Sequence, residues 1–138
     1  MAQTLRDSIT EKVYDLYDDL KVQLIEINQS KQLFMNGPSQ ELMKRAFNIS
    51  YYQGQKQAIE AIQKIIDDNE EAHTLVKQFR DYQTRVKDKQ INLSEVMQLI
   101  SQPQSKLEEV LDQHYHYMGQ SYIITQVENK IKEVSESF

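Results

Sequence analysis

Glu70 and His73 have residue types and a spacing that could bind a metal ion. They stand three residues apart, so on a helix both side chains would lie on one face, as in the Glu-x-x-His half-site of di-iron helix bundles. A complete site needs a second such pair and two more inward-facing glutamates, yet neither His114 nor His116 has a glutamate three residues before it. A metal site at Glu70 and His73 is one interpretation, and an exposed helix start stabilised by its acids is the simpler one.

His114 and His116 form a second histidine group, in the run His-Tyr-His-Tyr that ends at Tyr117. If this segment is helical, the two imidazoles cannot bind one ion, because residues two apart on a helix point about 200° away from each other. We expect His114 to lie on an apolar face and His116 off it. His114 is therefore predicted to be a packing residue whose protonation would make its surroundings pH-sensitive.

Sequence motifs for covalent catalysis and nucleotide binding are missing. There is no G-x-S-x-G nucleophile motif, and three isolated glycines cannot form a phosphate-binding loop. The lack of cysteine excludes disulfides, thiolate metal sites and cysteine nucleophiles. We therefore predict a non-enzymatic protein with no catalytic residues and no cofactor.

The elements that position these residues are predicted to be helices. The chain has 138 residues, with only 3 glycines and 2 prolines, and many residues that favour long helices. This composition predicts an all-α fold, a long antiparallel helical hairpin or bundle of four to five helices in one domain, 1–138. Its parts are a long N-terminal helix, 1–36, a helical hairpin, 39–90, and C-terminal helices, 93–138.

Apolar residues at helical spacing mark the first two helices. The first should begin near Leu5 and end near Asn36-Gly37, and the second should run from about Gln40 to Ile66. Gly54 in the second helix predicts a bend or, as we favour, a close helix crossing. The expected apolar positions are Leu5, Ile9, Val13, Leu16, Leu20, Leu24 and Ile27 in the first helix, and Leu42, Ala46, Ile49, Ala58, Ile62 and Ile65 in the second.

The third helix should begin with a capping box of Asp68 and Glu71 and stop near Gln90. Its apolar residues Leu75, Phe79, Tyr82 and Val86 alternate at steps of three and four like a coiled-coil seam. Capping-box patterns also start at Asn92, before a short apolar piece that includes Val96 and Met97, and at Ser105. The last helix should carry one broad face, formed by Leu107, Val110, Leu111, His114, Tyr117, Met118, Ser121, Ile124, Val127, Ile131 and Val134.

We expect the seam of the third helix to pack and to bind a second copy of the chain. A helix of about 30 residues spans about 45 Å, and hairpins of that length leave apolar surface uncovered unless another element lies on it. The predicted interface residues are Leu75, Phe79, Tyr82, Gln83, Val86, Tyr117 and Ile124.

The net charge of −5 and the hydropathy pattern bear on partners and location. No basic tail is present, so direct nucleic-acid binding is not expected. No secretion signal or long apolar run is present, so we predict a cytoplasmic protein that does not enter membranes. A modest basic patch contains Lys77, Arg80, Arg85, Lys87 and Lys89. Such a run usually forms a solvated helix face, and the alternative is a surface that binds an acidic partner or RNA.

A run in the second half of the chain resembles the YlbF/YmcA family of small bacterial helical proteins. The matching residues are Asp68, Glu71-Ala72, Leu75, Phe79, Gln83 and Gln90, and the resemblance covers about residues 40–138. Two features depart from the family pattern. Ile91-Asn92-Leu93 replaces a glycine-containing connector, and the cysteine-bearing tail of some members is missing. The resemblance implies a helical, often dimeric accessory protein linked to competence, sporulation, biofilm formation and control of RNA processing.

The sequence therefore favours a non-enzymatic protein that regulates by binding other proteins and itself. Two alternatives stay open. One is a phage or bacteriocin-immunity type of helical protein that binds a single target. The other is a metal-binding helical bundle that uses Glu70 and His73.

Overall fold

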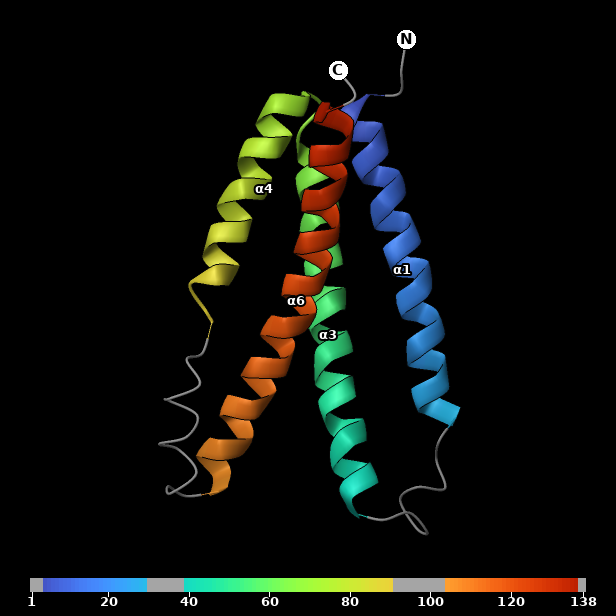
Figure 1. The fold of residues 1–138 in the computed structure, drawn as a ribbon, viewed down its shortest axis with the longest axis vertical. Helices are drawn as coiled ribbons and strands as arrows, with labels where there is room; N and C mark the ends of the chain where they lie inside the picture. Colours follow the sequence, from blue (N-terminus) through green and yellow to red (C-terminus); the bar gives the residue numbers. More distant parts are fainter. Residues whose placement is uncertain (1–3, 30–38, 91–103, 137–138) are drawn as a thin grey trace.

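The computed structural model describes residues 4–29, 39–90 and 104–136, which contain four helices packed as a bundle. The helices are α1 (Leu5–Gln29), α3 (Ser39–Asp68), α4 (Ala72–Lys87) and α6 (Gln104–Glu136). Successive helices run in opposite directions, so α3 and α6 point the same way (Figure 1). The predicted all-α class is confirmed. None of the described helices is long and apolar enough to cross a membrane.

The predicted helix boundaries agree with the structure to within a few residues wherever both are defined. The first helix begins at Leu5, α3 extends two residues past the predicted Ile66, and α6 begins one residue before the predicted Ser105. The expected end at Asn36-Gly37 lies outside the described residues. So do the start at Asn92 and the apolar piece that follows it.

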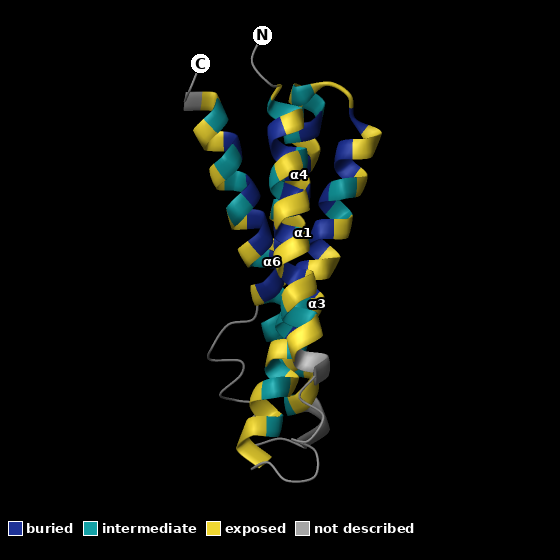
Figure 2. Ribbon diagram, turned by 90° about the vertical axis from the view of Figure 1, so that its right-hand side faces the viewer, coloured by how far each residue is buried: buried dark blue, intermediate teal, exposed yellow. Residues whose placement is uncertain are grey.

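The buried core lies toward the end of the bundle that carries both chain termini (Figure 2). Burial of these apolar side chains is the main favourable contribution to folding. The opposite ends of α3 and α6 are mostly exposed or half-buried. The core residues are Ile9, Val13, Leu16 and Leu20 of α1, Ala58, Ile59, Ile62, Ile65 and Ile66 of α3, Leu75, Phe79, Tyr82 and Val86 of α4, and Ile123, Ile124, Val127 and Ile131 of α6.

The closest approach in the bundle is between α3 and α6, at Gly54 and Gly119. A Cβ atom on Gly54 would collide with the carbonyl group of His116, 2.8 Å from its carbon. A Cβ atom on Gly119 would collide with the carbonyl oxygen of Tyr51 and lie 2.9 Å from the amide nitrogen of Gln55. Each glycine therefore lets the backbone of the other helix enter the space of a side chain, and the predicted close crossing is confirmed.

This crossing changes the expected partner of α3. The sequence predicted a hairpin in which the second and third helices pack on each other. In the structure α3 packs mainly against α6 and far less against α4, and α4 leans away from α3 toward its own C-terminal end (Figure 1). The reason is that backbone-to-backbone contact at Gly54 and Gly119 brings two long helices together along much of their length.

The seam of α4 is buried inside the chain. Leu75 and Phe79 are each 1% exposed, and Tyr82 and Val86 are also in the core. These side chains are covered within one copy of the chain, and self-association through them stays a prediction. The seam is a packing surface whose partners, α3, α6 and α1, belong to the same chain.

Asn69 and Arg6 hold the corner between α3 and α4. The Asn69 amide group donates to the carbonyl of Ile65 and to Oε1 of Gln78, each at 2.8 Å. The Arg6 guanidinium donates to the carbonyls of Ile66 and Asn69, each at 3.2 Å. These bonds add donors to carbonyls at and just after the end of α3, where the last turn of a helix leaves carbonyls without intrahelical partners.

The predicted capping box at this corner is wrong. Glu71, rather than Asp68, occupies the cap position of α4, and its side chain makes no capping hydrogen bond. Because Asn69 turns inward and bonds to Ile65 and Gln78, the chain enters α4 three residues later than Asp68. The corner is therefore stabilised by a buried amide and an arginine.

Gly54→Ala and Gly119→Ala should each destabilise the protein. Helix propensity alone predicts that alanine gains about 1 kcal/mol over glycine. The structure predicts the opposite sign, a decrease of about 1–3 kcal/mol in the unfolding free energy. The reason is that the Cβ atom would collide with backbone atoms, which cannot move aside as a flexible side chain does. Urea unfolding monitored by circular dichroism measures the difference. Gln53→Ala, at the exposed residue before Gly54, is the control and should change stability by less than about 0.5 kcal/mol.

Phe79→Ala should cost roughly 3–5 kcal/mol of unfolding free energy, because the ring is almost fully buried. Sedimentation of the folded variant should match that of the native chain, since the ring is buried within one copy. Lys77→Ala, an exposed neighbour on α4, is the control. Loss of association by Phe79→Ala with unchanged stability would restore the intermolecular interpretation of the seam.

Candidate functional site

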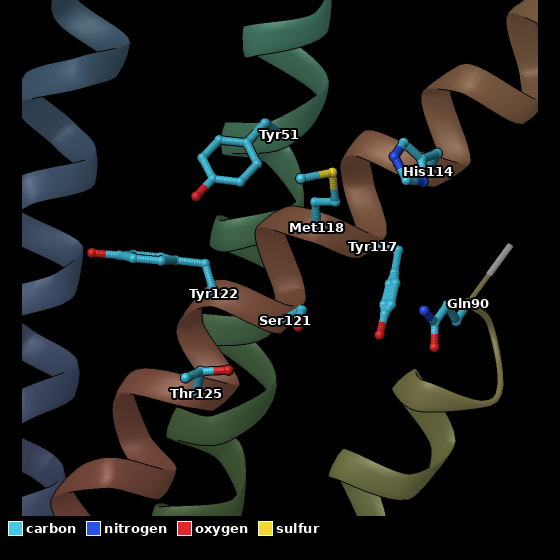
Figure 3. A pocket seen from close by; sticks show the side chains of 8 residues that line it. All are labelled: Tyr51, Gln90, His114, Tyr117, Met118, Ser121, Tyr122 and Thr125. Carbon is cyan, nitrogen blue, oxygen red and sulfur yellow. The ribbon is translucent and has the colours of Figure 1, made fainter. Parts of the chain in front are cut away.

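The α3–α6 crossing places two tyrosines side by side. Tyr51 lies three residues before Gly54, and Tyr122 lies three residues after Gly119, so each ring stands one turn from the point of closest approach. The ring centroids are 6.4 Å apart and the ring planes are inclined by 50°. Both hydroxyl groups point to the side on which α1 lies (Figure 3). The crossing thus builds an aromatic wall from two helices.

An open cavity of about 530 Å³ lies on one side of this wall, and we call it the α4-side cavity. It is bounded mainly by α6 and by Gln90, which follows α4 (Figure 3). Met118 is 44% exposed and Tyr122 is 41% exposed. The full lining is Tyr51, Gln90, His114, Tyr117, Met118, Ser121, Tyr122 and Thr125.

A second cavity, of about 450 Å³, lies on the other side of the wall between α1, α3 and α6, and we call it the α1-side cavity. Tyr51 and Tyr122 line it as well, and they are joined there by Tyr52. The Tyr52 ring lies edge-on to Tyr51, with centroids 5.5 Å apart. The remaining lining residues are Leu16, Asp19, Leu20, Val22, Gln23 and Gln55.

Burial and neighbouring hydroxyls keep Tyr51 protonated. Burial raises the pKa of the Tyr51 hydroxyl above 10.0, and the adjacent Tyr122 and Tyr52 raise this pKa further, because two tyrosinates would repel each other. A hydrogen bond from Gln55, itself buried, lowers the pKa in part. At neutral pH Tyr51 therefore presents a neutral ring.

A layer of polar side chains crosses between α3 and α6 around the glycines. The Ser50 hydroxyl donates to the carbonyl of Asp112 at 2.9 Å. Gln57 accepts hydrogen bonds from the imidazole of His116 and, at 3.2 Å, from the amide of Gln120. These bonds satisfy the buried polar groups of Ser50 and Gln120, which would be costly to leave unpaired.

Tyr82 of α4 lies near Gln120 of this layer. Burial raises the pKa of the Tyr82 hydroxyl above 10.0, and the nearby Gln120 amide and the charge of Arg85 lower this pKa in part. Tyr82 and Gln120 are both buried. The phenol is therefore held in its neutral form where α4 meets α6.

The two residues considered for metal binding do not form a site. Glu70 and His73 are exposed, and the His73 side chain is 81% exposed, with Glu71 as its nearest acid at 3.7 Å. Across residues 4–29, 39–90 and 104–136, no three histidine or acidic side chains gather closely enough to hold a metal ion. The structure thus places both candidates at the solvent-facing start of α4.

The structure separates the two histidines of α6, as their spacing predicted. His114 is half-buried and lines the α4-side cavity. His116, expected to lie off the packing face, instead meets Gln57 across the α3–α6 crossing. The close approach at Gly54, which places the His116 backbone against α3, is the reason for this difference.

The remaining predicted interface and basic residues occupy separate places. Ile124 is in the core, whereas Tyr117 is half-buried in the α4-side cavity. Gln83 lies beside Arg80, which forms an ion pair with Glu128 of α6. Lys132 approaches the same carboxylate at 3.8 Å. Lys77, Arg85, Lys87 and Lys89 are exposed.

Two features of α6 escaped the sequence reading. The sequence predicts Met118 on the apolar packing face, but this residue is exposed, whereas Ile123, which is not part of the predicted face, is fully buried. A Tyr-x-x-Gly run at Tyr51 and a Gly-x-x-Tyr run at Gly119 were the available signals for the crossing. Their pairing in space could not be read from either run alone.

Comparison of the chain with family models, with curated proteins and with solved structures finds no match in any of the three. Its class is therefore defined by its own architecture, which is an all-α bundle with a tyrosine wall at a close helix crossing.

Tyr82→Phe should reduce the loss of stability at alkaline pH. The pKa of Tyr82 is higher in the folded protein than in the unfolded chain, where it is near 10.0. Below that pH both states keep the proton. As the pH rises through about 10, the Tyr82 hydroxyl loses its proton in the unfolded chain before it does so in the folded protein. The unfolding free energy therefore falls. Urea unfolding at about pH 9 and about pH 11 should therefore show a smaller decrease for Tyr82→Phe than for the native chain.

The control for this measurement is Tyr14→Phe, which removes an exposed hydroxyl from α1. Equal decreases for the two variants between the two pH values would contradict the assignment of Tyr82.

Proposed function

We propose that this chain is a non-enzymatic helical protein that acts by binding other polypeptides. The proposal rests on one observation, a set of large apolar side chains exposed around the tyrosine wall. We call Val22, Ile25, Met118 and Tyr122 the interaction face; their exposed fractions are 53%, 55%, 44% and 41%. Exposed apolar residues that form a continuous patch mark binding sites.

The members of this face are close to one another. Val22 and Tyr122 line the same α1-side cavity, Met118 and Tyr122 line the same α4-side cavity, and Ile25 lies one turn from Val22 on α1. Tyrosine and methionine are enriched in protein interfaces, because tyrosine combines an apolar ring with a polar end and methionine adapts to irregular surfaces. The face thus offers anchors to a partner protein.

A second copy of the chain is the first partner to test. The predicted self-association seam is buried, so in this proposal homo-oligomerisation uses the interaction face instead. The resemblance to the YlbF/YmcA family favours the same kind of role, a small helical regulator that associates with itself and with other proteins. Its matching residues Leu75 and Phe79 would then maintain the fold, while the interaction face would contact partners.

The double variant Val22→Lys, Tyr122→Lys should lose partner binding and keep its fold. Both side chains are about half exposed, so their replacement should change stability by no more than roughly 1 kcal/mol. Each charge would have to be buried in the interface, at a cost of several kcal/mol. Sedimentation velocity over a concentration series measures self-association, and affinity capture from the source lysate with quantitative mass spectrometry compares the captured proteins.

The matched control is Tyr14→Lys, Met43→Lys, which introduces two charges at apolar residues of similar exposure that line neither cavity. We expect the control to associate and capture partners like the native chain. If the native chain, the variant and the control sediment alike and capture the same proteins, the proposal is wrong.

A further inference from the structure

The α1-side cavity combines three aromatic rings with a single charged group. Tyr51, Tyr52 and Tyr122 come from two helices, and Asp19 of α1 is the charged residue of the lining. Among the residues that the structure describes, no lysine, arginine or histidine lines this cavity. The combination of several ring faces and one carboxylate is suited to an organic cation, because the face of an aromatic ring carries partial negative charge.

The rings are held in place by neighbours outside the cluster. The Tyr52 hydroxyl donates to Oε1 of Gln23 at 3.2 Å, which ties the ring to α1. Gln55, buried beneath the cluster, hydrogen-bonds to the Tyr51 hydroxyl. The Tyr122 ring extends from α6 toward α1 (Figure 3). The rings of Tyr51 and Tyr52, held by these neighbours, lose little freedom when a ligand binds.

The floor of the cavity keeps water away from one side of a bound group. Leu16 is 5% exposed and Leu20 is 1% exposed, and both belong to the apolar core. A cation–aromatic contact gains most when the cation is partly removed from water. A methylated ammonium or a guanidinium group, which binds water less tightly than a simple ammonium does, would lose the least on entering such a site.

The charge around the cavity favours a positive ligand. No ion pair of Asp19 is found among the described residues, so its carboxylate is available to a ligand. Helix α1 carries six acidic side chains against three basic ones. Lys21 lies 4.4 Å from the centroid of the Tyr17 ring, so the chain already pairs a cation with a tyrosine on this helix.

We propose that the α1-side cavity is a binding site for an organic cation, a guanidinium or alkylated ammonium group, held by the rings of Tyr51, Tyr52 and Tyr122 and by the carboxylate of Asp19. The site shares Val22 and Tyr122 with the interaction face but goes beyond the proposed function, because a small cation needs no partner protein to bind there. The cation comes either from a free small molecule or from a basic side chain of a polypeptide.

The test is a titration of the full chain with tetramethylammonium and with ethylguanidinium, followed by proton NMR. The methyl protons of a bound tetramethylammonium ion should shift upfield, and they should show nuclear Overhauser contacts to tyrosine ring protons. With several rings and one carboxylate, the dissociation constants should be on the order of 1 mM. The neutral analogue tert-butanol has nearly the same shape and should bind at least about tenfold more weakly.

Two pairs of variants locate the site. Tyr122→Leu should weaken binding about tenfold, whereas Tyr14→Leu, at an exposed tyrosine outside the lining, should leave it unchanged. Asp19→Asn should weaken binding about threefold at low salt, and the loss should shrink at higher salt. Its matched control, Asp18→Asn, changes the exposed neighbour outside the lining. Circular dichroism verifies that each variant is folded.

Two blocked amino acids, acetyl-arginine amide and acetyl-trimethyllysine amide, distinguish the two sources of the cation. Binding at least about tenfold tighter than that of the free cations identifies a polypeptide source, and equal or weaker binding identifies a small molecule. The proposal is overturned if the two free cations cause no shift at about 50 mM, well above the expected dissociation constant. Equal binding of tert-butanol, or unchanged binding by folded Tyr122→Leu, would also overturn it.

Discussion

The contact between the backbones of α3 and α6 is the constraint on which the other features of this structure depend. At Gly54 and at Gly119, a backbone group of the other helix occupies the space that a Cβ atom would fill. Glycine within a helix costs about 1 kcal/mol of propensity at each position, so the close packing and the hydrogen bonds along the crossing must offset that cost. The pairs Ser50–Asp112 and His116–Gln57 form there because the helices are close enough for short polar side chains to meet.

The same crossing explains why the surface features gather where they do. One turn from each glycine, Tyr51 and Tyr122 have no room to pack between the two helices, so their rings project to the side and form a wall between two cavities. Helix α1 closes one cavity, and α6 with the residue after α4 bounds the other. Tyr122 belongs to both the proposed interaction face and the proposed cation site. A partner polypeptide and a bound cation would therefore influence each other through one ring.

The site was predictable from the sequence only in parts. The glycine at position 54 indicated a close crossing because glycine in a helix is otherwise unfavourable. The exposure of Met118 and the burial of Ile123 were not predictable, because helical periodicity predicts one unbroken apolar stripe along α6. Around Gly119 the face that meets α3 is set by backbone contact, so the hydrophobic pattern alone misplaces Met118 and omits Ile123, although it places Ile124 correctly.

What the sequence determined by itself was local: the all-α class, the starts and ends of α3 and α6 to within a few residues, and the apolar stripes of α1 and α4. These follow from helical periodicity and from the residues that begin and end helices, which act over a few positions. The contacts between helices set the rest: α3 packs chiefly on α6, the seam with Phe79 faces inward, and Asp19 lines one cavity together with three tyrosines. Those outcomes depend on contacts between residues far apart in the chain. A periodic pattern indicates which face of a helix is buried but does not determine which other helix packs on that face.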